Sequence, residues 1–190
     1  MVVASQLRNG MAIRHEGQPY KIVSAEYHPG QGKMGGVTHT RLQNLATGTF
    51  WETSFRAELK FEELPLERKP MDFLYSDEST CYFMDPQSGD QAEVPIELLG
   101  DRAGFLTNDM RVSVEFLDER PVSVVFPAQI EIRVKDTAPG IHGQGDNTWK
   151  EAKLENNVAV MVPQFIQNGD VIRLDLTTMK YMDRAKRVGS

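Results

Sequence analysis

Residues 28–36, HPGQGKMGG, decide how the first part of this chain folds. The segment places four glycines and one proline around a single lysine, Lys33. Glycine adopts the positive backbone dihedral angles that a tight reversal of the chain requires. The flanking sequence is typical of β-strands, with residues 19–27 leading in and residues 37–42 leading out. We therefore expect a long β-hairpin that carries one cationic side chain at an otherwise bare tip.

The remainder of the chain is also dominated by short strand-like segments, and helical periodicity is scarce. Residues 65–70 are charged and bounded by prolines, which is typical of a domain boundary. Regularly spaced short strands are typical of small β-barrels or sandwiches. We predict an all-β protein with three consecutive domains, at residues 1–65, 66–128 and 129–190.

Several strands are expected beyond the hairpin, together with one short helical turn at residues 95–99. Between residues 110 and 116 apolar side chains alternate with polar ones, which predicts that one face of that strand is buried. The expected strands are residues 49–56, 71–75, 81–84, 110–116, 121–127, 130–134, 150–154, 158–163 and 171–176.

Composition restricts the class of protein. A hydrophobic share of 40% is enough for packed cores, and the net charge of −6 argues against indiscriminate binding to nucleic acid. Residues 1–64 hold 7 Lys and Arg against 6 Asp and Glu, whereas residues 65–190 hold 14 against 21. Such a chain would need shape and a few placed cations to bind RNA.

The location of the protein is also limited by composition. The single Cys81 excludes an internal disulfide framework and a multi-cysteine metal site, and it fits a reducing compartment. No segment is long and apolar enough to cross a bilayer, and no signal peptide is evident. We expect a cytoplasmic protein that does not bind membranes.

Enzyme and cofactor signals are weak. Residues 30–35 satisfy the pattern G-x-G-x-x-G, but that dinucleotide fingerprint requires a helix to follow, and residues 37–42 are typical of a strand. An ordinary structural turn would explain the glycines but not the lone lysine among them. No histidines have the i, i+4 spacing of a helical metal pair, and a cross-strand contact between His28 and His39 is expected to be structural. We predict no catalysis, no metal and no cofactor. The four histidines are His15, His28, His39 and His142.

Motifs near both ends carry the strongest signal. The N-terminal motifs are LRNG at 7–10, GQPY at 17–20, Pro29-Gly30 with Gly32-Lys33, and RLQNLATGT at 41–49. The C-terminal motifs are Lys150-Glu151-Ala152, VMVP at 160–163, Ile166, Gly169, Tyr181 and Arg184. In this order and spacing, the whole chain resembles bacterial elongation factor P.

That resemblance implies a fold and a function. The fold is an SH3-like or KOW-like barrel followed by two OB-fold barrels, in an L-shaped arrangement comparable with tRNA. The function is that of a translation elongation factor, which binds the ribosome beside peptidyl-tRNA or initiator tRNA and relieves stalling at consecutive prolines. In the family a tip lysine, often modified after translation by a dedicated enzyme, points along the CCA end of the tRNA.

The tip departs from the family pattern in two ways. Counting forward from the first hairpin places Gln31 where many members carry the lysine, whereas counting back from Arg41 places Lys33 in register. We prefer Lys33, because the outgoing strand fixes the tip. Met34 stands where a glycine usually follows the lysine, so the family's modification chemistry does not transfer directly. Further on, Asn157 replaces a usual glycine, and Asn tolerates a left-handed backbone.

The predicted site therefore centres on Lys33, as the contact to tRNA near the peptidyl-transferase centre and as a candidate for modification. A monomer is the simplest expectation. Two alternatives remain: an elongation factor P-like paralogue with a different stalling substrate, and a single-stranded RNA-binding protein that acts without the ribosome. The supporting tip residues are Pro29, Gly30, Gln31, Gly32, Met34, Gly35 and Gly36, and candidate contacts to RNA backbone are Arg8, Arg41, Arg56, Tyr181 and Arg184.

Overall fold

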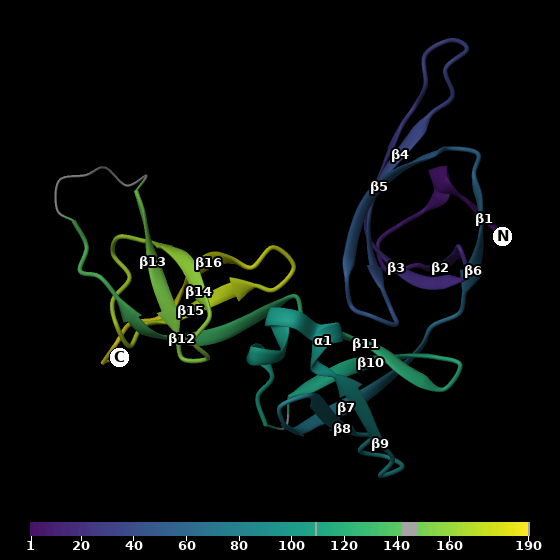
Figure 1. Ribbon diagram of the computed structural model, residues 1–190. Coiled ribbons are helices and arrows are strands. Elements are labelled where there is room, and N and C mark those ends of the chain that lie inside the picture. Colours follow the sequence, from purple (N-terminus) through teal and green to yellow (C-terminus); the bar gives the residue numbers. More distant parts are fainter. Residues whose placement is uncertain (109, 142–147, 190) are drawn as a thin grey trace. The chain divides into compact units, whose positions relative to one another are not determined.

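The computed structural model describes residues 1–108, 110–141 and 148–189. Its regular structure is mainly antiparallel strands, which form three sheets (Figure 1). Strands account for 56% of the chain and helices for 7%. The all-β prediction is therefore confirmed. Among the described residues, none of the helices is both long enough and apolar enough to cross a bilayer.

The chain divides into two compact units. One consists of Met1–Gly100 with Asn108–Val125 and holds the first two sheets; the other consists of Asp101–Thr107 with Phe126–Ser190 and holds the third. Residues 101–107 thus belong with the third sheet, although they lie inside the predicted central domain. The domain boundaries stay a prediction.

The first sheet has the strand order β1-β6-β2-β3-β4-β5. The predicted hairpin is present, since β3 and β4, the two longest strands of this sheet, pair from Tyr20 opposite Asn44 to His28 opposite Val37. Apolar side chains such as Ile13, Ile22 and Leu42 are fully buried in the core of this first sheet. The strands are β1 (Val2–Val3), β2 (Ala12–His15), β3 (Gln18–His28), β4 (Val37–Asn44), β5 (Phe50–Arg56) and β6 (Lys60–Leu64).

The second sheet has the order β11-β10-β7-β8-β9. The predicted helical turn is α1 (Ile96–Leu99), which leads into the 3-10 helix η2 (Gly100–Phe105). Cys81 is buried among these strands, as expected of a small core residue. Burial, and to a lesser degree the nearby Asp77 carboxylate, raises the pKa of its thiol to about 11, so it is a poor nucleophile. The strands are β7 (Glu67–Ser76), β8 (Thr80–Met84), β9 (Gln91–Pro95), β10 (Arg111–Leu117) and β11 (Arg120–Val125).

The third sheet has the order β14-β13-β12-β15-β16. Phe105 from η2 joins its core, and Asn156 Nδ2 donates to the Gly104 carbonyl oxygen at 3.1 Å. Asn157 has φ 68°, so the left-handed backbone predicted at this position is confirmed. The strands are β12 (Gln129–Thr137), β13 (Trp149–Leu154), β14 (Ala159–Pro163), β15 (Val171–Asp175) and β16 (Lys180–Lys186).

A buried carboxylate joins the first sheet to the second. Glu115 lies on the face of β10 that the alternation assigns to polar side chains, yet it is fully buried. Its two oxygens accept hydrogen bonds from Lys21 Nζ on β3, from Arg68 Nε on β7 at 2.9 Å and from Ser123 Oγ on β11 at 2.5 Å. Burial alone would raise the pKa of Glu115, but the bonds from these cations and Ser123 lower it overall.

Apolar packing surrounds this ionic contact. Ala12, Leu45 and Leu64 of the first sheet pack with Leu117 and Val122 of the second. Gln43 Nε2, also from the first sheet, donates to the Leu98 carbonyl oxygen at 3.0 Å. Because Lys21 is on β3, the strand that continues into the hairpin is held directly against the neighbouring barrel.

Replacing Glu115 with Gln should lower the free energy of unfolding at pH 7 by roughly 2–3 kcal/mol, because two cations lose their buried partner. The folded-state pKa lies below the ordinary value of 4.5, so this stabilisation is present above that pH and is lost as the pH falls through the folded-state pKa. Urea unfolding of wild type and variant should therefore differ most near neutrality and converge in acid. The matched control is Glu93→Gln, an exposed position on β9 where we expect a change below about 0.5 kcal/mol. A difference that does not depend on pH would contradict this account.

Candidate functional site

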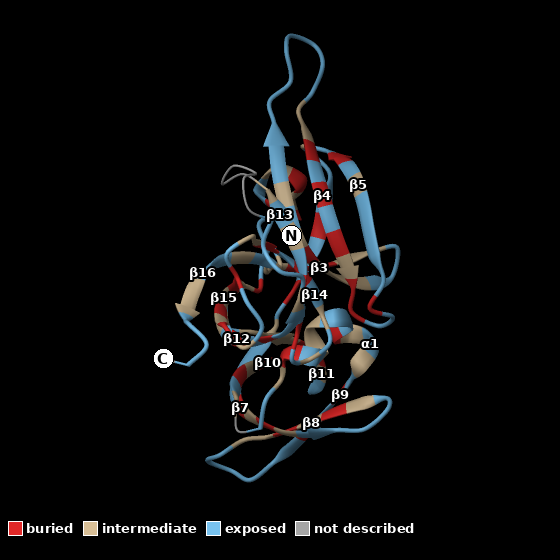
Figure 2. Ribbon diagram, turned by 90° about the vertical axis from the view of Figure 1, so that its left-hand side faces the viewer, coloured by how far each residue is buried: buried red, intermediate tan, exposed pale blue. Residues whose placement is uncertain are grey.

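The hairpin tip presents Lys33 to solvent. Gln31 and Met34 close a turn through a hydrogen bond from the Met34 amide to the Gln31 carbonyl oxygen at 3.2 Å, with Gly32 and Lys33 at its centre. Gly32 has φ +61°, a conformation that favours glycine. Every residue from Tyr27 to Gly35 is exposed, and Figure 2 shows the loop in the exposed colour throughout. Lys33 thus occupies the tip, and Gln31 stands at the entry to the turn.

No hydrogen bond or ion pair in the described parts of the chain involves the Lys33 ammonium. Its neighbour Met34 has 80% of its surface exposed, so a flexible apolar side chain stands beside the cation. The loop therefore presents a charge with three N–H donors and no partner of its own. Such a group is available to an external acceptor.

Two glycines make the loop narrow. A β-carbon at Gly30 would lie 1.8 Å from the Met34 carbonyl oxygen, and one at Gly36 would lie 2.6 Å from the Tyr27 ring. Gly36 is also tied to the body of the barrel, because its carbonyl oxygen accepts a bond from the Ala57 amide at 2.8 Å. The two sides of the loop can approach this closely only without side chains at Gly30 and Gly36.

A histidine pair lies below the loop. The rings of His28 and His39 are 4.8 Å apart, edge to face, which confirms the predicted cross-strand contact. His28 Nε2 is 3.4 Å from Glu26 Oε1, and His39 Nδ1 is 2.5 Å from Ser54 Oγ. Within residues 1–108, 110–141 and 148–189, no three acidic, Cys or His side chains are grouped to hold a metal ion. His142 lies outside the described residues.

The arginines proposed for RNA contact have different surroundings. Arg56 is exposed and pairs in register with Val37, at the base of the loop. Arg8 is also exposed, and neither it nor Arg56 has an ion-pair partner in the part of the chain that the structure describes. Arg41 is 3.7 Å from Glu52 and its guanidinium carbon stands 4.7 Å from the centre of the Phe50 ring. Three of the candidates thus belong to the barrel that carries the hairpin.

The other two candidates belong to the third sheet. Tyr181 packs edge to face against Trp149, and burial raises the pKa of its hydroxyl. Arg184 lies 3.7 Å from the buried carboxylate of Asp170 and 5.0 Å from the centre of the Phe165 ring. The structure thus places Tyr181 and Arg184 on β16, in a unit separate from the hairpin.

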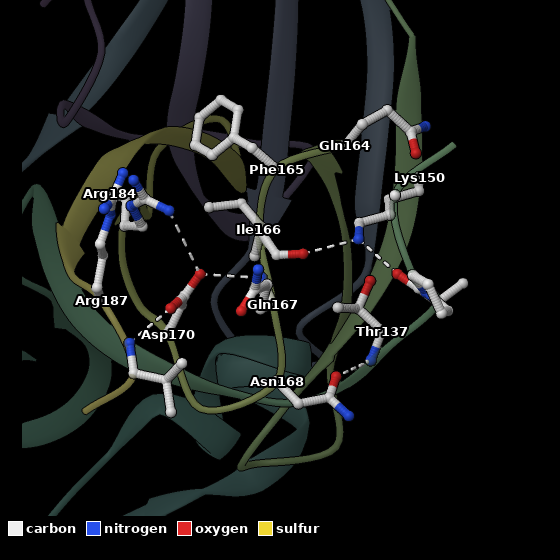
Figure 3. Close-up of a pocket in the computed structure, with 14 residues that line it drawn as sticks. Thr137, Lys150, Gln164, Phe165, Ile166, Gln167, Asn168, Asp170, Arg184 and Arg187 are labelled. Carbon is white, nitrogen blue, oxygen red and sulfur yellow. Dashed lines mark hydrogen bonds and ion pairs between the residues drawn. The ribbon is translucent and has the colours of Figure 1, made fainter. Parts of the chain in front are cut away.

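Arg184 lines a pocket of about 920 Å³ that the sequence analysis did not find (Figure 3). Three segments far apart in sequence form it: residues 137–140, 164–170 and 184–188, with Lys150 from β13. Lys150 Nζ donates to the carbonyl oxygens of Ala138 and Ile166, at 2.5 and 2.7 Å, and so joins two of these segments. Burial lowers the pKa of Lys150. The only sequence signal was the motif spacing from Lys150 to Gly169.

The three sheets coincide with three family models. Residues 3–61 match the elongation factor P KOW-like domain, residues 66–124 its OB domain, and residues 130–184 its C-terminal domain. The chain belongs to the elongation factor P family. The KOW-like and OB-type architecture implied by the resemblance is therefore confirmed.

Individual relatives span the whole chain. Elongation factor P of Symbiobacterium thermophilum is 36% identical over 97% of this chain and 100% of its own length, and that of Clostridium acetobutylicum is 35% identical over 98% and 100%. A solved structure titled eukaryotic translation initiation factor 5A from Methanococcus jannaschii overlaps 65% of this chain and 92% of its own, at 18% identity and a TM-score of 0.45. Membership of the elongation factor P family identifies the chain as a translation factor.

Replacing Gly30 with Ala should distort the tip without unfolding the barrel, because the added carbon meets the Met34 backbone and not a movable side chain. In ¹⁵N–¹H correlation spectra we expect large shifts confined to residues 29–36. Gly35→Ala is the matched control, since its β-carbon would meet only the Glu58 carboxylate, at an ordinary distance of 3.5 Å. Equal spectral changes in the two variants would show that the loop is not constrained at Gly30 as described.

Proposed function

We propose that this chain binds the ribosome beside peptidyl-tRNA and promotes peptide-bond formation at runs of consecutive prolines. The observation that carries the proposal is the exposed ammonium of Lys33, which has no partner within the described parts of the chain and lies at the tip of a narrow glycine hairpin, in a member of the elongation factor P family. The ribosome carries out the chemistry of peptide transfer, and the factor positions the peptidyl-tRNA for it.

The mechanism is entropic. Proline reacts poorly as donor and acceptor, partly because its ring restricts the approach of the reacting groups. Lys33 donates hydrogen bonds to phosphate or sugar oxygens of the CCA end and so restricts the peptidyl-tRNA to a reactive pose. A stiff hairpin increases this effect, because less conformational entropy of the loop is lost when Lys33 binds.

Further cations contribute contacts to RNA backbone. Arg41 lies on β4, a strand of the hairpin, and Arg56 lies on the neighbouring β5 at the base of the loop. Arg8 is a third candidate. Tyr181 and Arg184 supply contacts from the third sheet. The protein acts as a monomer in the cytoplasm, and it uses no metal or cofactor.

Lys33→Ala should abolish relief of stalling on a proline-run reporter in reconstituted translation, with the folded state intact, because the exposed side chain contributes nothing to packing. The matched control is Lys60→Ala, which removes an exposed lysine from β6 of the same barrel and should retain full activity. Full activity of the Lys33 variant would reject the mechanism.

Two further experiments distinguish the alternative functions. A reporter with other stalling sequences distinguishes a paralogue with a different substrate, which would act there and not at prolines. Cosedimentation with intact ribosomes, compared with affinity for free oligonucleotide across a salt series, distinguishes a ribosome-independent RNA-binding protein.

We also propose that Lys33 is the residue that a modifying enzyme recognises, with Met34 changing the chemistry accepted beside it. Protein isolated from its native host should then have an intact mass above that of the unmodified chain, and tryptic mapping should place the adduct on Lys33. The Lys33→Arg variant from the same host should have the mass of its unmodified sequence. An unmodified native protein, or an adduct elsewhere, would refute this assignment.

A further inference from the structure

Met34 places a thioether in solvent directly beside the cation of the hairpin tip. It has 80% of its surface exposed, and its neighbours in sequence are Lys33 and a glycine. Two other methionines inside the chain are also exposed, Met161 by 51% and Met182 by 43%, whereas Met71 is buried. Apart from the N-terminal residue, Met34 therefore has the most accessible sulfur of this chain.

The backbone of Met34 is held on both sides by the loop. Its amide donates to the Gln31 carbonyl oxygen at 3.2 Å, and its own carbonyl oxygen lies against Gly30, where a β-carbon would be 1.8 Å away. The only other apolar side chain within residues 28–36 is that of Pro29, which is itself exposed. The loop thus has no core in which the thioether could be buried, and Met34 stays open to small solutes.

An exposed thioether reacts with peroxides. A lone pair of the sulfur attacks one oxygen of hydrogen peroxide, the O–O bond breaks, and the products are the sulfoxide and water. The sulfur is oxidised by two electrons and the peroxide is reduced by the same two. The product has a polar oxygen that accepts hydrogen bonds, whereas the thioether is apolar and only a weak acceptor. Methionine sulfoxide reductases reverse the reaction with electrons from a thiol.

We propose that Met34 is a site of reversible oxidation by peroxides and that its sulfoxide inactivates the hairpin tip. The Lys33 ammonium has three N–H donors and no acceptor among the described residues, and the sulfoxide gives it an acceptor on the adjacent residue. That oxygen competes with the external oxygens that Lys33 would otherwise bind. It also adds bulk to a loop that Gly30 and Gly36 keep narrow. The loss of activity rests on the proposed function of Lys33, whereas the oxidation itself does not.

The first measurement follows the chemistry alone. The full chain is treated with limiting hydrogen peroxide at neutral pH, the reaction is stopped with catalase, and tryptic peptides are mapped by mass spectrometry. We expect Met34 to gain one oxygen atom faster than Met161 and Met182, and Met71 to react last, in the order of their exposure. Oxidation of Met34 that is no faster than that of Met161 would overturn the assignment of the site.

The second measurement is relief of stalling on the proline-run reporter, with each protein compared before and after peroxide treatment. Oxidised wild type should lose activity roughly tenfold, as expected for the loss of a charge-assisted contact, and should regain it after treatment with methionine sulfoxide reductases A and B and dithiothreitol. Met34→Leu should keep its own untreated activity after peroxide. The matched control Met161→Leu, at an exposed position of β14, should lose as much as wild type.

The outcomes separate this inference from the proposed function. Untreated wild type without activity on the reporter would reject the proposed function, and the loss of activity on oxidation with it. Active wild type that stays fully active after oxidation of Met34 would overturn the inactivation alone. An equal loss in Met34→Leu and wild type would do the same, because the loss would then come from another residue.

Discussion

The close backbone approach at Gly30 is the constraint on which the presentation of Lys33 depends. A lysine side chain reaches beyond its own protein only if the loop that carries it is narrow and does not fold back. The loop meets this requirement with backbone alone, since a side chain at Gly30 or Gly36 would occupy the space of the opposite segment. What remains at the tip is a turn with a glycine of positive φ and one cation that has no hydrogen-bond or ion-pair partner among the residues that the structure describes.

A narrow loop positions a charge only if its base is fixed, and the ionic contact at Glu115 provides this. The strand that enters the loop carries Lys21 seven residues before His28, and the Lys21 ammonium is bonded to a carboxylate buried in the second sheet. Breaking such a buried contact leaves an unpaired charge, so it favours one arrangement of the two barrels. The hairpin is therefore an extension of a two-barrel body and not of one small barrel.

The parts of this architecture that are local in sequence could be predicted. Glycines between two strand-like segments predicted the hairpin, and the Asn at 157 predicted a left-handed backbone. The two registers of the tip gave different residues, and Lys33 was preferred over Gln31 because the outgoing strand fixes the tip. The hydrogen bond from the Met34 amide to the Gln31 carbonyl oxygen places Lys33 at the centre of the turn.

Features that depend on distant segments could not be predicted. Alternation assigned Glu115 to the polar face of its strand, yet it is fully buried, with bonds from Arg68 and Ser123 of its own sheet and from Lys21 of the first sheet. The pocket lined by Lys150 and Arg184 joins three segments that lie between residues 137 and 188, and Lys150 bonds to carbonyl oxygens of two of them. No spacing in a single sequence carries that information.

The central claim is that one ammonium group reaches the 3′ end of a tRNA. Electron cryomicroscopy of the full chain bound to a ribosome stalled at consecutive prolines measures this directly. The account predicts the Lys33 nitrogen, or a group attached to it, within hydrogen-bond distance of a phosphate or sugar oxygen of the CCA end. A bound factor whose Lys33 points into solvent or contacts only protein would contradict it.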